Sequence, residues 1–218
     1  GWITSATVDG EERLAQVLAD DAAYKPLGIE PEIGRKSGTL PHSYFRYFFH
    51  PDRMLKKQQA QTQSRARELQ QMEADLLQVY ASYDGQGKPD AVNKRSAIWY
   101  EAVVVPVIAG IAFGVPSTLA INVTNGNLID GLPTDTIVEV TADVIDGKIE
   151  PRLPRKLPPP QMFAMLQANA AYERTLVESI LENDPDLLVQ AFLLNPLVPS
   201  YDVAKEVVAE IWSQRGAY

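Results

Sequence analysis

Residues 137–150 read IVEVTADVIDGKIE, and this stretch decides which kind of fold the chain can form. Apolar and polar side chains alternate from Ile137 to Ala142, which is typical of a β-strand with one buried face. The pair Asp146-Gly147 follows, and Asp-Gly is a preferred two-residue turn between antiparallel strands because both residues tolerate a left-handed backbone. We therefore predict a hairpin that ends in Lys148-Ile149-Glu150 and belongs to a small sheet.

The sequence before the hairpin predicts mainly helices. Leucine and valine at helical spacing indicate one helix within Glu11–Asp20, and a run rich in Gln, Ala, Leu, Arg and Glu indicates a long one over Arg53–Tyr80. Another helix starts near Val92, and its second half is apolar on nearly all sides, which predicts a helix buried in the centre of a domain. Glycines and prolines between Pro26 and Gly38 predict a loop.

The remaining segments complete a mixed pattern. Thr118–Val123 predicts another strand, and the proline-rich residues 151–160 predict an extended connector. Asp184 is a predicted N-cap in front of Pro185. Three further helices are expected, at Gln161–Asn183, Pro185–Leu194 and Tyr201–Arg215. The predicted fold class is α+β, with helices around a small, mostly antiparallel sheet in a single domain over residues 1–218.

Composition excludes several kinds of site. The chain has 20 Lys+Arg against 28 Asp+Glu and a net charge of −8, which disfavours binding to nucleic acid or to an anionic membrane. It has no Cys, which excludes disulfides, thiolate zinc sites and a cysteine nucleophile, and its two His are too few for a His-rich metal site. The segment from Arg46 to Glu68 holds six basic residues and two acids. That segment is either a solvated helix face or a surface that meets a phosphorylated ligand or an acidic partner.

The ends of the chain and its apolar runs bear on localisation. The first residues, Gly1-Trp2-Ile3-Thr4, include no methionine, so we expect a piece of a larger protein, with a processed or cloned N-terminus as the alternative. No basic segment followed by an apolar one opens the chain. The longest apolar run, Ala102–Ile111, is about half of a membrane span. The expected localisation is therefore cytoplasmic.

Two segments carry side chains suited to chemistry or binding. Lys94 and Arg95 precede Tyr100 by about one and a half helical turns, and nearby cations favour a phenolate that can accept a proton. The alternative is a tyrosine that packs and donates one hydrogen bond. Asn122 and Asn125 lie at the end of a predicted strand. They belong either to a tight turn or to a site where their two amides bind sugar hydroxyls.

Several short motifs, each weak alone, occur together in a characteristic order. They are Gly1-Trp2; Leu40-Pro41-His42-Ser43-Tyr44-Phe45-Arg46-Tyr47-Phe48; Lys94-Arg95 through Tyr100; Asn122-x-x-Asn125 with Leu132-Pro133-x-Asp135-x-x-Val138-Glu139-Val140; Tyr172-Glu173-Arg174; and Asn195-Pro196-Leu197-Val198. In this order the chain resembles the C-terminal domain of the glycoside hydrolases of family four. These are NAD- and manganese-dependent glycosidases, and the likeness is greatest to their 6-phospho-β-glucosidase branch.

The resemblance implies a C-terminal domain like that of lactate and malate dehydrogenases, and an oxidation–elimination–addition mechanism, distinct from the two-carboxylate scheme. In the family, NAD⁺ takes a hydride from sugar C3, and a tyrosinate removes the C2 proton while a divalent metal holds O2 and O3. By motif position Tyr100 is that base. The substrate-binding residues implied by resemblance are Arg95, Asn122, Asn125, His42 and Arg46.

The same resemblance implies the partners. The family's glycine-rich loop and its metal-binding Cys and His lie upstream of the motifs found here, so NAD and Mn would be bound mainly by an N-terminal Rossmann domain. The implied substrate is a phosphorylated disaccharide or glucoside, and the implied assembly is a homo-oligomer. On its own the chain is expected to be inactive.

The chain departs from the family pattern in three segments. Around the tyrosine, Ser96-Ala97 replaces Gly-Gly and Glu101 replaces the following Ser. Asn125-Gly126-Asn127 replaces the family's Asn-x-Gly order, and His42 replaces Asn. A carboxylate beside Tyr100 opposes a phenolate if both face one pocket. An alternative is therefore a non-catalytic module, derived from the family, for sugar-phosphate binding or oligomerisation.

Overall fold

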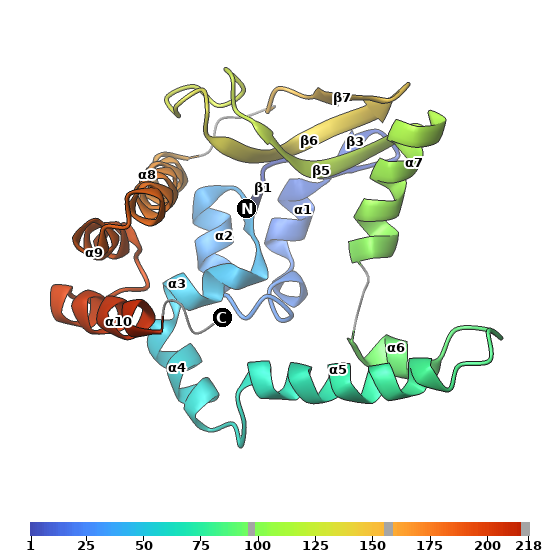
Figure 1. The fold of residues 1–218 in the computed structure, drawn as a ribbon. Helices are drawn as coiled ribbons and strands as arrows, with labels where there is room; N and C mark the ends of the chain where they lie inside the picture. The colour runs from blue at the N-terminus through green and yellow to red at the C-terminus, as the bar shows by residue number, and fades with distance from the viewer. Residues whose placement is uncertain (96–98, 155–158, 215–218) are drawn as a thin grey trace. The chain divides into compact units, whose positions relative to one another are not determined.

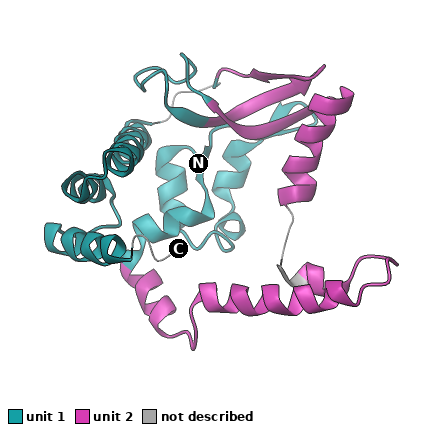
Figure 2. Ribbon diagram, in the orientation of Figure 1, with its two compact units in different colours: residues 1–51, 124–138, 154–218 teal, residues 52–123, 139–153 magenta. Residues whose placement is uncertain are grey.

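The computed structural model describes residues 1–95, 99–154 and 159–214 (Figure 1). They form two compact units, each assembled from segments far apart in the sequence (Figure 2). Unit 1 comprises Gly1–Pro51, Thr124–Val138 and Pro154–Tyr218, and unit 2 comprises Asp52–Val123 and Glu139–Leu153. Within the described residues, no helix combines the length and the apolar character needed to cross a membrane.

The predicted hairpin is confirmed as part of a three-stranded sheet in the order β5-β6-β7. Its strands are β5 Ser117–Thr124, β6 Ile137–Ile145 and β7 Lys148–Pro151. Strands β6 and β7 pair antiparallel, and Ile145 lies opposite Lys148. Asp146 (φ 48°) and Gly147 (φ 75°) form the turn in the left-handed region, as Asp-Gly predicts. Every second residue of β6 is buried, namely Val138, Val140, Ala142 and Val144.

Unit 1 combines short strands with two groups of packed helices. Its first segment holds two short antiparallel pairs, β1 Trp2–Ile3 with β4 Leu40–Pro41 and β2 Thr7–Val8 with β3 Glu11–Glu12. Its helices there are α1 Leu14–Ala19, η1 Asp21–Ala23, α2 Pro31–Ser37, η2 Ser43–Phe45 and α3 Arg46–Phe49. Leu14, Leu18 and Tyr24 form one buried cluster.

The last segment of unit 1 is helical, as predicted. Its helices are α8 Pro160–Glu182, α9 Pro185–Leu194 and α10 Tyr201–Ser213. The carboxylate of Asp184 accepts hydrogen bonds from the backbone N–H groups of Asp186 and Leu187, so the predicted N-cap is confirmed. A second buried cluster holds α9 and α10 together; it consists of Leu188, Val189, Ala204 and Val208. The α+β class is therefore confirmed.

The long helix predicted over Arg53–Tyr80 is wrong, because the chain forms two helices there. They are α4 Pro51–Gln59 and α5 Arg65–Ala81. Ser64 begins the second one, since its hydroxyl accepts a hydrogen bond from the backbone N–H of Arg67 at 3.3 Å. A serine side chain favours this capping position over a helix interior, so it divides the periodic run.

The loop predicted between Pro26 and Gly38 is wrong in its second half, where α2 forms. Pro31 occupies the start of this helix and Gly38 ends it with φ 68°. Gly34 faces Tyr24 so closely that a Cβ built on it would lie 2.4 Å from the phenol oxygen. The glycine therefore serves close packing inside a helix and does not mark a turn.

The apolar helix after Val92 is also divided and is not buried on all sides. It comprises α6 Asp90–Arg95, the π-helical segment η3 Tyr100–Val104 and α7 Val105–Phe113. In α7 the fully buried residue is Gly110, while Ile108 is 55% exposed and Phe113 is 81% exposed. One face of α7 lies against the sheet of unit 2, where Gly110 meets Val144 of β6 (Figure 1).

Candidate functional site

Tyr100 is the first residue of the π-helical segment η3 in unit 2. Its side chain is 66% exposed, and its carbonyl accepts a hydrogen bond from the backbone N–H of Val105, five residues later. Such single π turns interrupt α-helices at functional sites more often than elsewhere. An exposed phenol on an irregular helical turn can reach a ligand, which a buried packing tyrosine could not do. The signal in the sequence that could have indicated this π turn is Pro106, because a proline inside a helical segment removes one backbone donor.

The cations predicted beside Tyr100 lie at the edge of what the structure describes. Arg95 is the last residue of α6, and its backbone is helical. The side chains of Lys94 and Arg95 are outside the described set, and so are Ser96 and Ala97, where the chain departs from the family's Gly-Gly. Glu101, the other departure, is exposed and follows Tyr100 in η3.

In unit 1, His42 and Arg46 lie in one short aromatic segment. His42 caps η2, and its Nδ1 accepts a hydrogen bond from the backbone N–H of Tyr44 at 3.3 Å. The guanidinium carbon of Arg46 lies 5.6 Å from the ring centroid of Tyr47, which is a cation–π contact. The structure therefore brings these two predicted residues into the same turn, within four positions of each other.

Three buried nitrogens in this part of unit 1 have no hydrogen-bond partner among the described residues; they are Trp2 Nε1, Arg46 Nε and His50 Nε2. The Trp2 ring lies 4.3 Å from the ring of Phe45, and the backbone N–H of His50 donates to the carbonyl of Arg46. A buried polar group without a partner costs about 1–3 kcal/mol. We call these three residues the nitrogen cluster, because oxygen atoms of a ligand are suitable hydrogen-bond partners for such nitrogens.

Sequence reasoning missed His50 as a member of this cluster. The available signal was its position four residues after Arg46, which is about one helical turn along the chain, although α3 ends at Phe49 and His50 follows the helix. Whether the ring nitrogen donates or accepts depends on the tautomer, so it can face either a phosphate oxygen or a sugar hydroxyl.

The two predicted amides have different environments. Asn122 is exposed on β5, on the same face as Thr118 and Ala120. Asn125 is 1% exposed. Its Nδ2 donates to the carbonyls of Ile129, Leu132 and Pro133, each at 3.2 Å, and its Oδ1 accepts from the Ile129 N–H at 2.8 Å. All of these partners belong to the loop that Asn125 starts, so the tight-turn interpretation describes Asn125 and leaves its amide no free group for a sugar.

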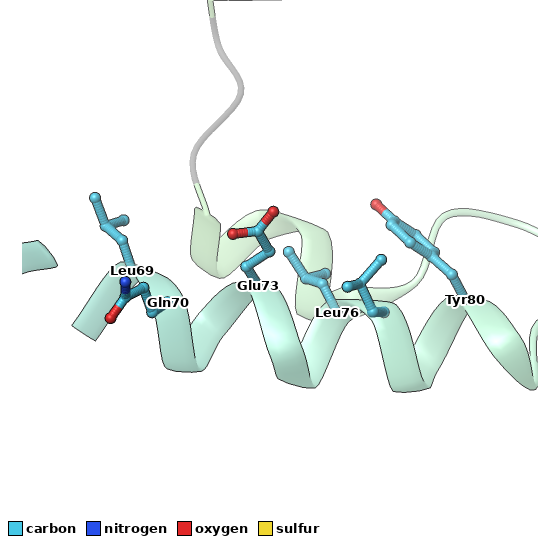
Figure 3. Close-up of a pocket in the computed structure, with 6 residues that line it drawn as sticks. Leu69, Gln70, Glu73, Leu76 and Tyr80 are labelled. Atoms are coloured by element: carbon cyan, nitrogen blue, oxygen red, sulfur yellow. The ribbon is translucent and has the colours of Figure 1, made fainter. Parts of the chain in front are cut away.

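Helix α5 of unit 2 carries a surface groove, shown in Figure 3. It is lined by Leu69, Gln70, Glu73, Leu76, Leu77 and Tyr80, whose side chains lie along one side of the helix. The lining includes the carboxylate of Glu73 and no cation. Carboxylate repels a phosphate dianion, so this groove is unsuited to a sugar phosphate.

The described residues do not fit a resident metal or dinucleotide. Among them no group of three or more His, Cys, Asp or Glu side chains could hold a metal ion. The sequence contains no G-x-G-x-x-G motif at the start of a helix, which dinucleotide binding by a Rossmann unit requires. The part of the chain that the structure describes therefore provides a candidate base and polar contacts, but not a redox or metal centre of its own.

Comparison with known proteins identifies a family match over most of the chain. Residues 1–198 match the sequence model of the family 4 glycosyl hydrolase C-terminal domain. A probable 6-phospho-β-glucosidase of Bacillus subtilis is 27% identical over 192 residues, which cover 87% of this chain and 43% of the relative. The 6-phospho-β-glucosidase BglT of Thermotoga maritima is 26% identical over 181 residues, or 82% of this chain and 42% of the relative. The chain thus spans less than half the length of these relatives.

Solved structures show the same fold. The T. maritima 6-phospho-β-glucosidase, crystallised with manganese, NAD⁺ and glucose-6-phosphate, superposes with a TM-score of 0.87 at 23% identity over 100% of this chain and 52% of that protein. A 6-phospho-α-glucosidase from gut microorganisms, crystallised with NAD and Mn²⁺, gives a TM-score of 0.76 at 18% identity over 100% of this chain and 54% of that protein.

Proposed function

The chain belongs to the family 4 glycosyl hydrolases, as their C-terminal domain, and from that premise we propose that it supplies the catalytic base and part of the sugar pocket of a 6-phospho-glucosidase. The observation that carries the proposal is the family match over residues 1–198, joined by relatives named as 6-phospho-glucosidases. The proposed substrate class is a phosphorylated disaccharide or glucoside.

Tyr100 is the proposed general base. Its phenolate oxygen takes the proton from C2 of the sugar, the C2–H bond breaks, and its electron pair stays on the sugar. The exposure of Tyr100, at 66%, supports the role because the oxygen must reach a bound ligand. Arg95 at the end of α6 is the proposed cation that favours the phenolate.

Within each unit, polar residues are proposed contacts for the sugar or its phosphate. We assign Arg46 and His42 to phosphate or hydroxyl oxygens, because Arg46 Nε is a buried donor without a partner among the described residues. Asn122 is exposed on β5 and free to meet a sugar hydroxyl, whereas we assign Asn125 to its own loop. His50 and Trp2 are further proposed contacts, since each has a buried ring nitrogen with no hydrogen-bond partner among the described residues.

NAD and manganese would be bound by the part of the family's proteins that this chain does not match. Neither hydride transfer nor metal coordination is assigned to the described residues, among which no group of three or more His, Cys, Asp or Glu side chains could hold a metal ion. We accordingly expect the 218-residue chain alone to be inactive, and its N-terminal NAD-binding domain to be its first partner. Assembly into a homo-oligomer remains a prediction from the family resemblance.

The test uses the chain joined to an upstream dinucleotide-binding domain of the family, with NAD⁺, Mn²⁺ and a chromogenic 6-phospho-β-glucoside. Tyr100→Phe should lower kcat about 100-fold or more, since a positioned general base contributes about 10²–10⁴-fold. Tyr80→Phe, the same change at an exposed tyrosine of the α5 groove, should leave kcat unchanged.

Two results would contradict the proposal. An unchanged rate in Tyr100→Phe would remove Tyr100 as the base. A joined protein without activity that still binds glucose-6-phosphate would instead favour the alternative, a non-catalytic sugar-phosphate module, which Glu101 beside Tyr100 also favours.

A further inference from the structure

The π turn at η3 changes which side chain occupies a given place on the helix. The backbone N–H of Val105 donates to the carbonyl of Tyr100, five residues before it. In a regular α-helix the same N–H would reach Glu101, four residues before it. A single π turn is therefore equivalent to one inserted residue. The residues on the N-terminal side of the π turn are therefore rotated about the helix axis by about 100° relative to their positions in a regular α-helix. This is the rotation that one residue contributes in such a helix.

Pro106 provides a physical cause for this π turn. It lies directly after Val105 and within the first two positions of α7. Proline has no N–H, so the carbonyl of Ala102 has no donor four residues later, and the proline ring would collide with that carbonyl in a regular helix. Helices accommodate such a proline by a kink or by a local change of hydrogen-bond spacing. The π turn immediately before Pro106 is such a change.

The end of α7 beyond Pro106 is anchored and does not rotate freely. A Cβ built on Gly110 would lie 2.4 Å from Cγ1 of Val144 on β6 and 3.1 Å from the carbonyl oxygen of Val115. Val144 is fully buried. A helix that approaches a strand this closely is held in one rotational setting, because interiors are densely packed. Any change of hydrogen-bond spacing before Pro106 must therefore appear as a rotation of the residues at the Tyr100 end.

We propose that Pro106 is a positioning residue for Tyr100. Through the π turn it places Tyr100, and not Glu101, at the helix position one turn before Val105, so that the Tyr100 side chain points about 100° away from its direction in a regular helix. The inference rests on the proposed role of Tyr100 as the base.

The first experiment tests the geometry without activity. Scalar couplings across hydrogen bonds are measured by NMR on the isotopically labelled 218-residue chain. The Val105 amide should couple to the Tyr100 carbonyl in the native chain and to the Glu101 carbonyl in Pro106→Ala. A Val105 coupling that stays on Tyr100 in Pro106→Ala would overturn the inference, because Pro106 would then not cause the turn.

The second experiment asks whether the turn positions the base. In the joined enzyme, Pro106→Ala should lower kcat about 100-fold, as small misplacements of a catalytic group do. KM should stay within about twofold, because the substitution changes no residue that is proposed to bind the substrate. Pro185→Ala, the same change at the start of α9, is the matched control and should leave kcat unchanged.

A rescue variant separates positioning from general damage. Deleting Glu101 in the Pro106→Ala background removes the one extra residue, so the Val105 N–H again reaches Tyr100, now as a regular α-helical bond. This variant should recover kcat to within about threefold of the parent, since the base regains its position. A deletion variant that folds by circular dichroism and stays as slow as Pro106→Ala would refute the positioning role.

The outcomes also distinguish this inference from the proposed function. If Tyr100→Phe keeps its rate, the proposed function fails whatever the NMR result. If Tyr100→Phe is inactive, and Pro106→Ala keeps its kcat although the Val105 coupling has moved to Glu101, only the positioning role fails.

Discussion

Replacing Asn125 by alanine should destabilise unit 1 because one side chain ties a whole loop together. Asn125 is 1% exposed, and its amide makes hydrogen bonds to three carbonyls and to the N–H of Ile129. Alanine leaves the buried Ile129 N–H without its acceptor and removes one donor from each carbonyl. A buried polar group left unpaired costs about 1–3 kcal/mol. Losing all the hydrogen bonds of the Asn125 amide should therefore lower the free energy of unfolding by about 3 kcal/mol.

The measurement is urea and thermal unfolding of the chain, followed by circular dichroism. A loss of about 3 kcal/mol corresponds to a fall in Tm of about 6–12 °C for a protein of this size. Asn122→Ala is the matched control, since the same amide is exposed on β5 and its loss should change stability by less than about 0.5 kcal/mol.

The reasoning would be refuted if Asn125→Ala unfolds at the same urea concentration as the native chain. A sugar-binding role for Asn125 predicts the opposite pattern, with unchanged stability and weaker binding of glucose-6-phosphate by the joined enzyme. The two measurements on one variant therefore decide between the loop role and the ligand role.

Two further predictions concern unit 2. Gly110→Ala should cost about 1–3 kcal/mol by overpacking, and adding Val144→Ala should cost less than the sum of the single changes, as a double-mutant cycle by urea unfolding would reveal. Hydrogen bonds from Arg152 and Thr118 hold the pKa of the Asp143 carboxyl below its usual range, and the bond from Arg152 has the larger effect. The stability this gives is present above the unfolded pKa of about 3.9 and is lost as the pH falls through the lower folded value. As the pH is lowered from about 6 into the acid range, the free energy of unfolding of Asp143→Asn should therefore fall less than that of the native chain. Equal losses in the two proteins would contradict this.

Elements that depend on neighbouring residues could be predicted from the sequence. The hairpin follows from period-two alternation and an Asp-Gly turn, and both are properties of consecutive residues. Helix α9 begins at Pro185 behind the Asp184 cap and ends at Leu194, as the same local signals predict. Helix α2 carries equally local signals, with Pro31 at its start, but the glycine inside it predicts a turn.

Where local signals competed, tertiary contacts decided. Gly34 is suited to a helix because the Tyr24 ring leaves no room for a Cβ, and no sequence window contains that contact. Likewise the apolar composition of α7 predicts burial on all sides, whereas Ile108 and Phe113 are exposed and Gly110 packs against Val144.

The candidate site divides in the same way. An order of short motifs is enough to establish the family, and with it to single out Tyr100, Arg46 and His42 as residues of interest. Their surroundings follow only from folding. Among the described residues, folding gives the buried nitrogens of Trp2 and His50 no hydrogen-bond partner, and it places Tyr100 at a π turn. The physical reason is that motifs record which side chains are present, whereas hydrogen bonding and rotation about a helix depend on groups brought together by folding.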